Sequence, residues 1–122
     1  MNYYIDNDLE SMWKRVEKSS YVDKKETMIS WLKIMEDGNL FKITKEEQHL
    51  IINSERLSDV EREEDEQLFN SEFKNNTFRV PVIIKDSYDN MILLYGGVHL
   101  EKMMEESDSC NVWIITKEWW RK

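Results

Sequence analysis

The residues best suited to chemistry are Gly96, Gly97 and His99, which directly follow the apolar run Met91–Tyr95. Free backbone N–H groups at a helix start attract phosphate or carboxylate, and glycines lack the Cβ atoms that would keep such an anion away. His99 adds a donor, since imidazole is neutral or charged near pH 7. The string is compatible with an anion site. The alternative is a tight turn that needs small residues, with His99 hydrogen-bonded to a neighbouring carbonyl.

The elements that would position these residues lie within 78–116. Val80–Ile84 and Met91–Tyr95 are apolar runs separated by a polar turn, which predicts an antiparallel hairpin. From Val98 the apolar spacing is helical, and Val112–Ile115 reads as a strand buried on both faces. We therefore expect a strand–hairpin–helix–strand core with the glycines at the second strand's end.

The preceding part of the chain, 1–73, is predicted to be mainly helical. Apolar residues recur at helical spacing within 8–18 and within 23–36. The capping-box pattern of Thr44–Glu47 predicts a further helix that runs on through Leu57. We expect one domain over 1–122 with an α+β fold, in which N-terminal helices pack on a small mixed sheet built from the last forty residues.

A second capping-box pattern at Ser58–Glu61 opens the most acidic part of the chain. The first turns of this helix carry five carboxylates: Glu61, Glu63, Glu64, Asp65 and Glu66. Acid there suits the positive end of the helix dipole. The run is either a solvated helix face or a docking surface for a basic protein partner. Metal binding ranks below both, because adjacent acids on a helix point in different directions.

Composition excludes several classes of protein. The net charge of -8 argues against direct nucleic-acid binding, which needs basic residues to neutralise phosphates. Cys110 is the only cysteine, which fits a reducing cytoplasm, and it is expected to be a small buried residue. No apolar stretch approaches the roughly 20 residues that span a bilayer. Trp119 and Trp120 are expected to fold back onto the domain, or else to form a surface contact.

Three segments match a known family in order and spacing: VPVIIKD at 80–86, MILLYGGVHLEKMME at 91–105 and NVWIIT at 111–116. With them the C-terminal third of the chain resembles the ParB/sulfiredoxin-like superfamily, to which many small phage proteins belong. Gly96 and Gly97 match the turn glycines of the family signature. The resemblance implies a pocket at the strand–helix turn for the phosphates of a nucleotide such as ATP or CTP.

The sequence departs from the family at two signature positions. Val98 stands where sulfiredoxins have cysteine. The sulfiredoxin reaction would therefore lack its nucleophile in this chain. Leu100 stands where an arginine would follow the signature histidine, His99, and Arg79 or Arg56 would have to replace it in space. We therefore predict no catalytic residue and expect catalysis to be weak or lost.

Three functions follow, in order of preference. The first is a small cytoplasmic domain that binds a nucleotide or another phosphate ligand at Gly96, Gly97 and His99. The second is an acidic, non-enzymatic interaction protein, such as a phage-encoded inhibitor of a host nucleic-acid-binding protein, acting in the host cytoplasm. The third is a DNA-binding or nuclease role, which the charge disfavours. A phosphate on the glycine turn would favour the first, and a carboxylate or tryptophan packed there would favour the second.

Overall fold

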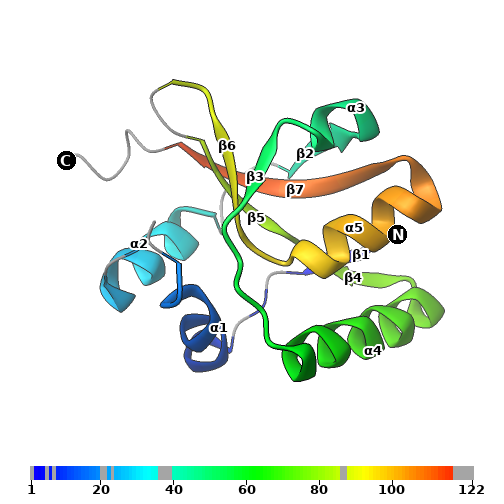
Figure 1. Cartoon of the computed structure of the whole chain (residues 1–122), viewed down its shortest axis with the longest axis horizontal. Coiled ribbons are helices and arrows are strands. Elements are labelled where there is room, and N and C mark those ends of the chain that lie inside the picture. The colour runs from blue at the N-terminus through cyan, green and yellow to red at the C-terminus, as the bar shows by residue number, and fades with distance from the viewer. Residues whose placement is uncertain are drawn as a thin grey trace.

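A computed structural model describes residues 2–4, 6, 8–19, 22, 24–35, 40–85 and 88–116 (Figure 1). The elements run in the order β1 (Asn2–Tyr4), α1 (Leu9–Val16), α2 (Lys25–Met35), β2 (Leu40–Thr44), α3 (Lys45–Gln48), β3 (Ile51–Asn53), α4 (Asp59–Asn75), β4 (Thr77–Arg79), β5 (Val82–Lys85), β6 (Met91–Tyr95), α5 (Gly97–Ser107) and β7 (Ser109–Thr116). Helices and a mixed sheet make this an α+β fold, which confirms the predicted fold class. The predictions for Trp119 and Trp120 lie outside the described residues.

The main sheet has five strands in the order β2-β7-β5-β6-β3. β5 and β6 form the predicted antiparallel hairpin, and β7 returns parallel to β5 after α5. β2 adds antiparallel to β7, and β3 adds parallel to β6. A separate two-stranded parallel ribbon joins β1 to β4, with Tyr4 opposite Arg79. The predicted core thus gains a strand on each side from the preceding half of the chain.

Side chains of the central strands alternate between two apolar clusters, one on each face of the sheet. Val82 and Ile84 of β5 pack with Met12, Val16 and Met28, which come from α1 and α2. Ile83, between them, faces the other cluster, on the side of α4 and α5. Period-two alternation with both faces covered explains why β5 reads as a continuous apolar run.

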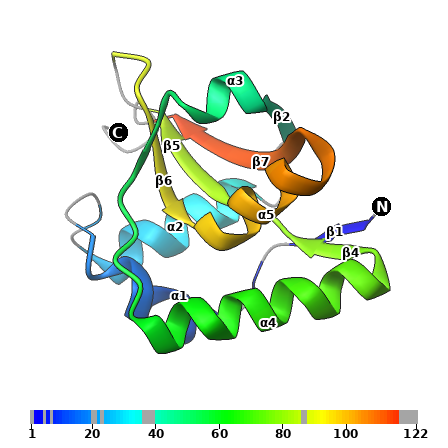
Figure 2. The same ribbon diagram turned by 45° about the vertical axis from the view of Figure 1, so that its right-hand side comes forward.

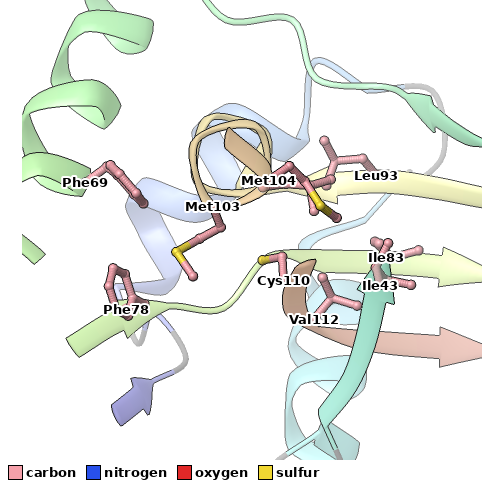
Figure 3. Close-up of a cluster of buried hydrophobic side chains, with 10 residues drawn as sticks. Ile43, Phe69, Phe78, Ile83, Leu93, Met103, Met104, Cys110 and Val112 are labelled. Atoms are coloured by element: carbon pink, nitrogen blue, oxygen red, sulfur yellow. The ribbon is translucent and has the colours of Figure 1, made fainter. Parts of the chain in front are cut away.

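The second cluster lies between the sheet and two helices. Figure 3 shows Met103 of α5 with Phe69 of α4 and Phe78 of β4 on one side and Cys110 and Val112 of β7 on the other. In Figure 2, α4 lies along α5 and the β1–β4 ribbon, on the outside of the molecule. This placement puts one face of α4 in the interior and the opposite face in solvent.

The helix predicted to start at Thr44 is much shorter than expected. The capping box forms, with Thr44 accepting from the Glu47 N–H at 3.3 Å, but α3 ends at Gln48. The chain then enters β3, where Ile51 and Ile52 are β-branched residues that suit a strand. The prediction of a helix through Leu57 was therefore wrong, because pairing with β6 outweighs local propensity. Among the described residues, no helix has the length and apolar character needed to cross a membrane.

Candidate functional site

The turn between β6 and α5 has the geometry that its glycines predict. Gly96 is the N-cap of α5 with a φ of 89°, a left-handed conformation in which a residue with a Cβ is strained. A Cβ added to Gly96 would lie 2.8 Å from the Pro81 Cα. Gly96 has no side chain to cap the helix, so the first N–H groups of α5 need an acceptor from elsewhere.

That acceptor is the carboxylate of Glu55. Its Oε1 accepts from the Gly97 N–H at 2.6 Å, and its Oε2 accepts from the Gly96 N–H at 3.3 Å. A Cβ on Gly97 would overlap Oε1 and would lie 2.8 Å from the Leu93 Cδ2, so a larger residue at this position would force the Glu55 and Leu93 side chains to move. The backbone donors expected to hold a phosphate therefore hold an anion of the chain itself.

Strand pairing brings Glu55 to this place. β3 runs parallel to β6 with Asn53 opposite Leu93. Ser54 continues the pairing, because its N–H donates to the Leu93 carbonyl at 3.2 Å. Glu55 follows, level with the end of β6, where the glycine turn begins. A residue about forty positions away along the chain thus takes the place of a local helix cap.

A cavity of about 200 Å³ opens beside the turn. Its lining comprises Asn53, Glu55, Leu57, Arg62, Gly97, Val98 and Glu101. Burial raises the pKa of the Glu55 carboxyl, and the hydrogen bond from the Gly97 N–H offsets only part of that rise. Arg62 is the one cation of the lining, and its Nη2 donates to Glu101 Oε1 and Oε2 at 3.1 and 2.9 Å. With two carboxylates and one guanidinium, the cavity is better suited to a cation than to a phosphate.

His99 points away from the turn and into the protein. It is 1% exposed, and its ring meets Phe69 edge-on with centroids 5.5 Å apart. Its Nε2 lies 2.7 Å from Glu72 Oε2, and its Nδ1 lies 3.5 Å from Arg79 Nη2. Because a guanidinium only donates, Nδ1 is the acceptor and Nε2 carries the proton that is donated to Glu72. The structure therefore does not bring His99 together with the turn N–H groups.

Glu72 is the buried acceptor at this point. It accepts from His99, from the Tyr4 hydroxyl and from the Arg79 N–H at 3.0 Å. Burial acts to raise the pKa of Glu72, but these hydrogen bonds outweigh it and hold that pKa below its ordinary value. Glu72 is therefore ionised at neutral pH. Through these hydrogen bonds it connects β1, β4 and α5 to α4.

Arg79 is the cation at the centre of this buried polar cluster. Its Nη1 donates to the Tyr95 hydroxyl at 3.0 Å, and its guanidinium carbon lies 4.8 Å from the centre of the Tyr95 ring. The Asp6 carboxylate lies 3.5 Å from Nη1, and the Asp65 carboxylate lies 3.5 Å from Nη2. Two buried atoms, Arg79 Nε and Asp65 Oδ2, have no hydrogen-bond partner within the described part of the chain. Of the two arginines considered as replacements at position 100, Arg79 lies beside His99, whereas Arg56 is exposed.

The five carboxylates of the acidic run do not share one surface. Asp65 is buried and accepts from Arg15 Nη1 of α1 at 2.5 Å. Glu61 accepts from Lys18 Nζ at 2.6 Å, and this bond holds the pKa of Glu61 down to about 2. Glu64 lies 3.3 Å from Arg15 but keeps 64% of its side chain exposed. Part of this run is therefore paired with cations of the chain itself, namely Arg15 of α1 and Lys18, which follows that helix.

The other two carboxylates face away from α1. Glu66 lies 3.4 Å from the Arg62 Nε, which connects it through Arg62 to Glu101 of α5. Glu63 is exposed, and within the described residues no cation lies in salt-bridge range of it. These two residues, and the exposed part of Glu64, are what remains of the predicted docking surface.

Cys110 lies in the interior of the protein. Cys110 is 4% exposed, and burial raises the pKa of its thiol to about 12, which disfavours the reactive thiolate form. Within the part of the chain that the structure describes, no three His, Cys, Asp or Glu side chains are grouped to hold a metal ion.

Sequence reasoning missed Glu55, Glu72 and Tyr95. Glu72 had a detectable signal, because Asp65, Phe69 and Glu72 follow the i, i+4, i+7 spacing of one helix face, and all three are buried. Glu55 had none, because its position depends on a strand that the sequence pattern had assigned to a helix.

Comparison of the chain with protein-family models, with curated proteins and with solved structures gives no match. The resemblance to the ParB/sulfiredoxin-like superfamily therefore remains a prediction from three sequence segments.

Proposed function

We propose that this chain is a non-catalytic interaction protein that docks a basic segment of another protein. The observation that carries the proposal is the Glu55 carboxylate on the Gly96 and Gly97 N–H groups. An anionic substrate would have to displace this internal anion, and it would approach a chain whose net charge is -8. The same charge attracts a cationic partner and speeds its association.

The surface proposed for docking is formed by carboxylates on α4 and α5, which we call the α4–α5 acidic surface: Glu63, Glu66, Glu101 and Glu105. The Arg62 contacts with Glu66 and Glu101 place the two helices' acids side by side. Glu63 neighbours Glu66 on α4, and Glu105 is exposed one turn beyond Glu101 on α5. Among the described residues, Arg62 is the only cation in salt-bridge range of any of these four acids. The surface therefore keeps a negative excess that suits lysine and arginine side chains.

A charge-reversal pair tests this surface. The variant Glu63→Lys/Glu66→Lys is compared with Glu17→Lys/Glu26→Lys, which makes the same change in net charge at exposed positions in or beside α1 and α2. Titration with an oligolysine peptide at several salt concentrations measures binding and its salt dependence. The proposal expects strong weakening in the first variant and little in the second. If both double variants bind oligolysine equally weakly, net charge alone explains the binding. The α4–α5 acidic surface would then not be the docking site.

A second candidate function is binding of a nucleotide phosphate at the same turn, as the family resemblance implies. One residue of the cavity lining favours it, because Arg62 could supply the guanidinium that position 100 lacks. Against it, about 200 Å³ is less than the roughly 300–1,000 Å³ of small-molecule pockets. Catalysis would still lack a nucleophile at Val98.

Calorimetry distinguishes the two functions. Wild-type protein, Glu55→Ala and the exposed control Glu17→Ala are titrated with ATP, CTP, GTP and ADP. The interaction proposal expects no nucleotide heat from any of them. The nucleotide candidate expects binding by wild type, or its appearance in Glu55→Ala once the N–H groups of Gly96 and Gly97 are free. Loss of that binding in His99→Ala would implicate the signature histidine.

A further inference from the structure

The N-terminal segment brings two polar side chains to the buried cluster around Arg79. β1 pairs with β4 so that Tyr4 lies opposite Arg79, and the Tyr4 carbonyl accepts from the Val80 N–H at 2.9 Å. Two residues further on, Asp6 Oδ2 accepts from the Tyr95 hydroxyl at 2.6 Å and lies 3.5 Å from Arg79 Nη1. The Asp8 N–H also donates to Asp6 Oδ1 at 2.9 Å. Asp6 is thus held by Arg79 of β4 and Tyr95 of β6 at one oxygen and by its own segment at the other.

These two donors form a cationic site. The Arg79 side chain is 6% exposed, and its guanidinium is oriented by the ring and hydroxyl of Tyr95. A guanidinium carries five N–H groups, and its fork geometry matches carboxylate and phosphate oxygens. The Nε of Arg79 is buried and has no partner among the described residues, so a donor remains unused. The groups of this site that face Asp6 Oδ2 are Arg79 Nη1 and the Tyr95 hydroxyl.

Asp6 is also the acid nearest to solvent among those that contact this cluster. Its side chain is 19% exposed, against 3% for Asp65 and 8% for Glu72. Asp65 is additionally held by Arg15, and Glu72 by His99, from elements that pack in the interior. A ligand that reaches Arg79 would therefore exchange with Asp6 and leave the other two carboxylates in place.

We propose that Arg79 and Tyr95 form an oxyanion-binding site that the Asp6 carboxylate occupies as an intramolecular ligand. An external carboxylate or phosphate takes this place when Asp6 is absent. In the intact chain the tether gives Asp6 a high effective concentration, so a simple anion competes poorly. This site is separate from the Glu55 contact on the glycine turn and does not depend on the proposed function.

Anion rescue of the full-length Asp6→Ala variant tests the site. Thermal unfolding is followed in sodium acetate, sodium phosphate and sodium chloride at matched ionic strength. Acetate and phosphate also stabilise proteins in general, so only the excess over the controls counts. Wild type is one control, and Asp8→Ala is the other. The Asp8 carboxylate is exposed on the same segment and caps α1, and alanine keeps the Asp8 N–H that donates to Asp6 Oδ1.

The expected result is a lower Tm for Asp6→Ala, which then rises saturably with acetate or phosphate and not with chloride. The two anions report whether a carboxylate or a phosphate fits better. Adding Tyr95→Phe to Asp6→Ala removes one donor and should weaken the rescue by raising the half-saturating concentration several-fold. If Asp6→Ala folds only with acetate or phosphate present, the proposal is supported. It is overturned if no anion exceeds the chloride effect, if Asp8→Ala responds equally, or if Asp6→Ala fails to fold in every salt.

Discussion

The starts of α4 and α5 both present backbone N–H groups to a carboxylate, but the two carboxylates come from different distances along the chain. At α4 the Ser58 side chain accepts from the Glu61 N–H at 3.1 Å, and Glu61 reaches back to the Ser58 N–H at 3.0 Å. At α5 the acceptor is Glu55, delivered by a strand on the sheet edge. A local cap forms from neighbours in sequence, whereas the second cap requires the tertiary fold.

The two carboxylates also differ in what their environment does to their charge. Lys18 holds the pKa of Glu61 down to about 2, which means that its ionised form is favoured. Burial raises the pKa of Glu55, which means that its ionised form is disfavoured despite the two N–H groups. The α4 start is thus electrostatically favourable, and the α5 start keeps its anion because glycine geometry and strand register place it there.

The largest effect is expected at Arg79, whose charge reaches Glu55 as well as the buried cluster. Arg79→Ala would leave Asp6 and Asp65 without their shared cation, at a cost of about 3–5 kcal/mol in the free energy of unfolding. Urea denaturation measures it. Arg62→Ala, at an arginine 46% exposed, serves as control and should cost less than about 1 kcal/mol. Equal losses of unfolding free energy in Arg79→Ala and Arg62→Ala would show that the buried cluster stabilises the fold no more than the exposed Arg62 contacts do.

Gly97→Ala comes next and acts on the α5 start alone. The new Cβ would overlap Glu55 Oε1 and crowd Leu93, so we expect a loss of about 1–3 kcal/mol in the free energy of unfolding. In a Glu55→Ala background the carboxylate clash is absent, and the same substitution should cost less. A double-mutant cycle from chemical denaturation measures that difference. Strict additivity would contradict the contact.

The variants Glu55→Gln and Glu61→Gln test the comparison of the two helix starts. The contributions of Glu55 and Glu61 to the free energy of unfolding should change with pH in opposite directions. A lowered pKa means that the Glu61 contribution, about 1 kcal/mol at neutral pH, is present above its ordinary pKa of 4.5 and is lost as pH falls toward about 2. A raised pKa means that the Glu55 contribution is greatest at acid pH and is lost as pH rises through its folded-state pKa. Denaturation of wild type and both variants from pH 2 to 8 measures both slopes. Slopes of the same sign would contradict this contrast.

The smallest effect on stability is expected at Glu63, which is exposed and unpaired with any described cation. Glu63→Lys should change the free energy of unfolding by no more than about 0.5 kcal/mol. Glu61→Lys in the same helix should cost more, since it breaks the cap and opposes Lys18. Thermal unfolding of the two variants measures the contrast. A large loss at Glu63 would mean that this side chain has a structural role.

Much of the C-terminal architecture was predictable, because it depends on local pattern. The β-branched run at 82–84 and the run Met91–Tyr95 indicated the hairpin, and Gly96-Gly97 indicated the helix start. The candidate site was predicted only in part. The N–H groups of the turn were expected to bind an anion, but the source of that anion was not. His99 was expected near the turn, and instead it is buried against Glu72.

Sequence alone was enough for the features that a few adjacent residues decide, namely the capping boxes at Thr44 and Ser58 and the apolar runs of β5 to β7. The tertiary structure decided which charges meet. The register of β3 on β6 brings Glu55 to the turn, and the packing of α1 on α4 brings Arg15 to Asp65. Charge partners far apart in sequence carry no local signal, because burial and long-range pairing select them only after the elements have assembled.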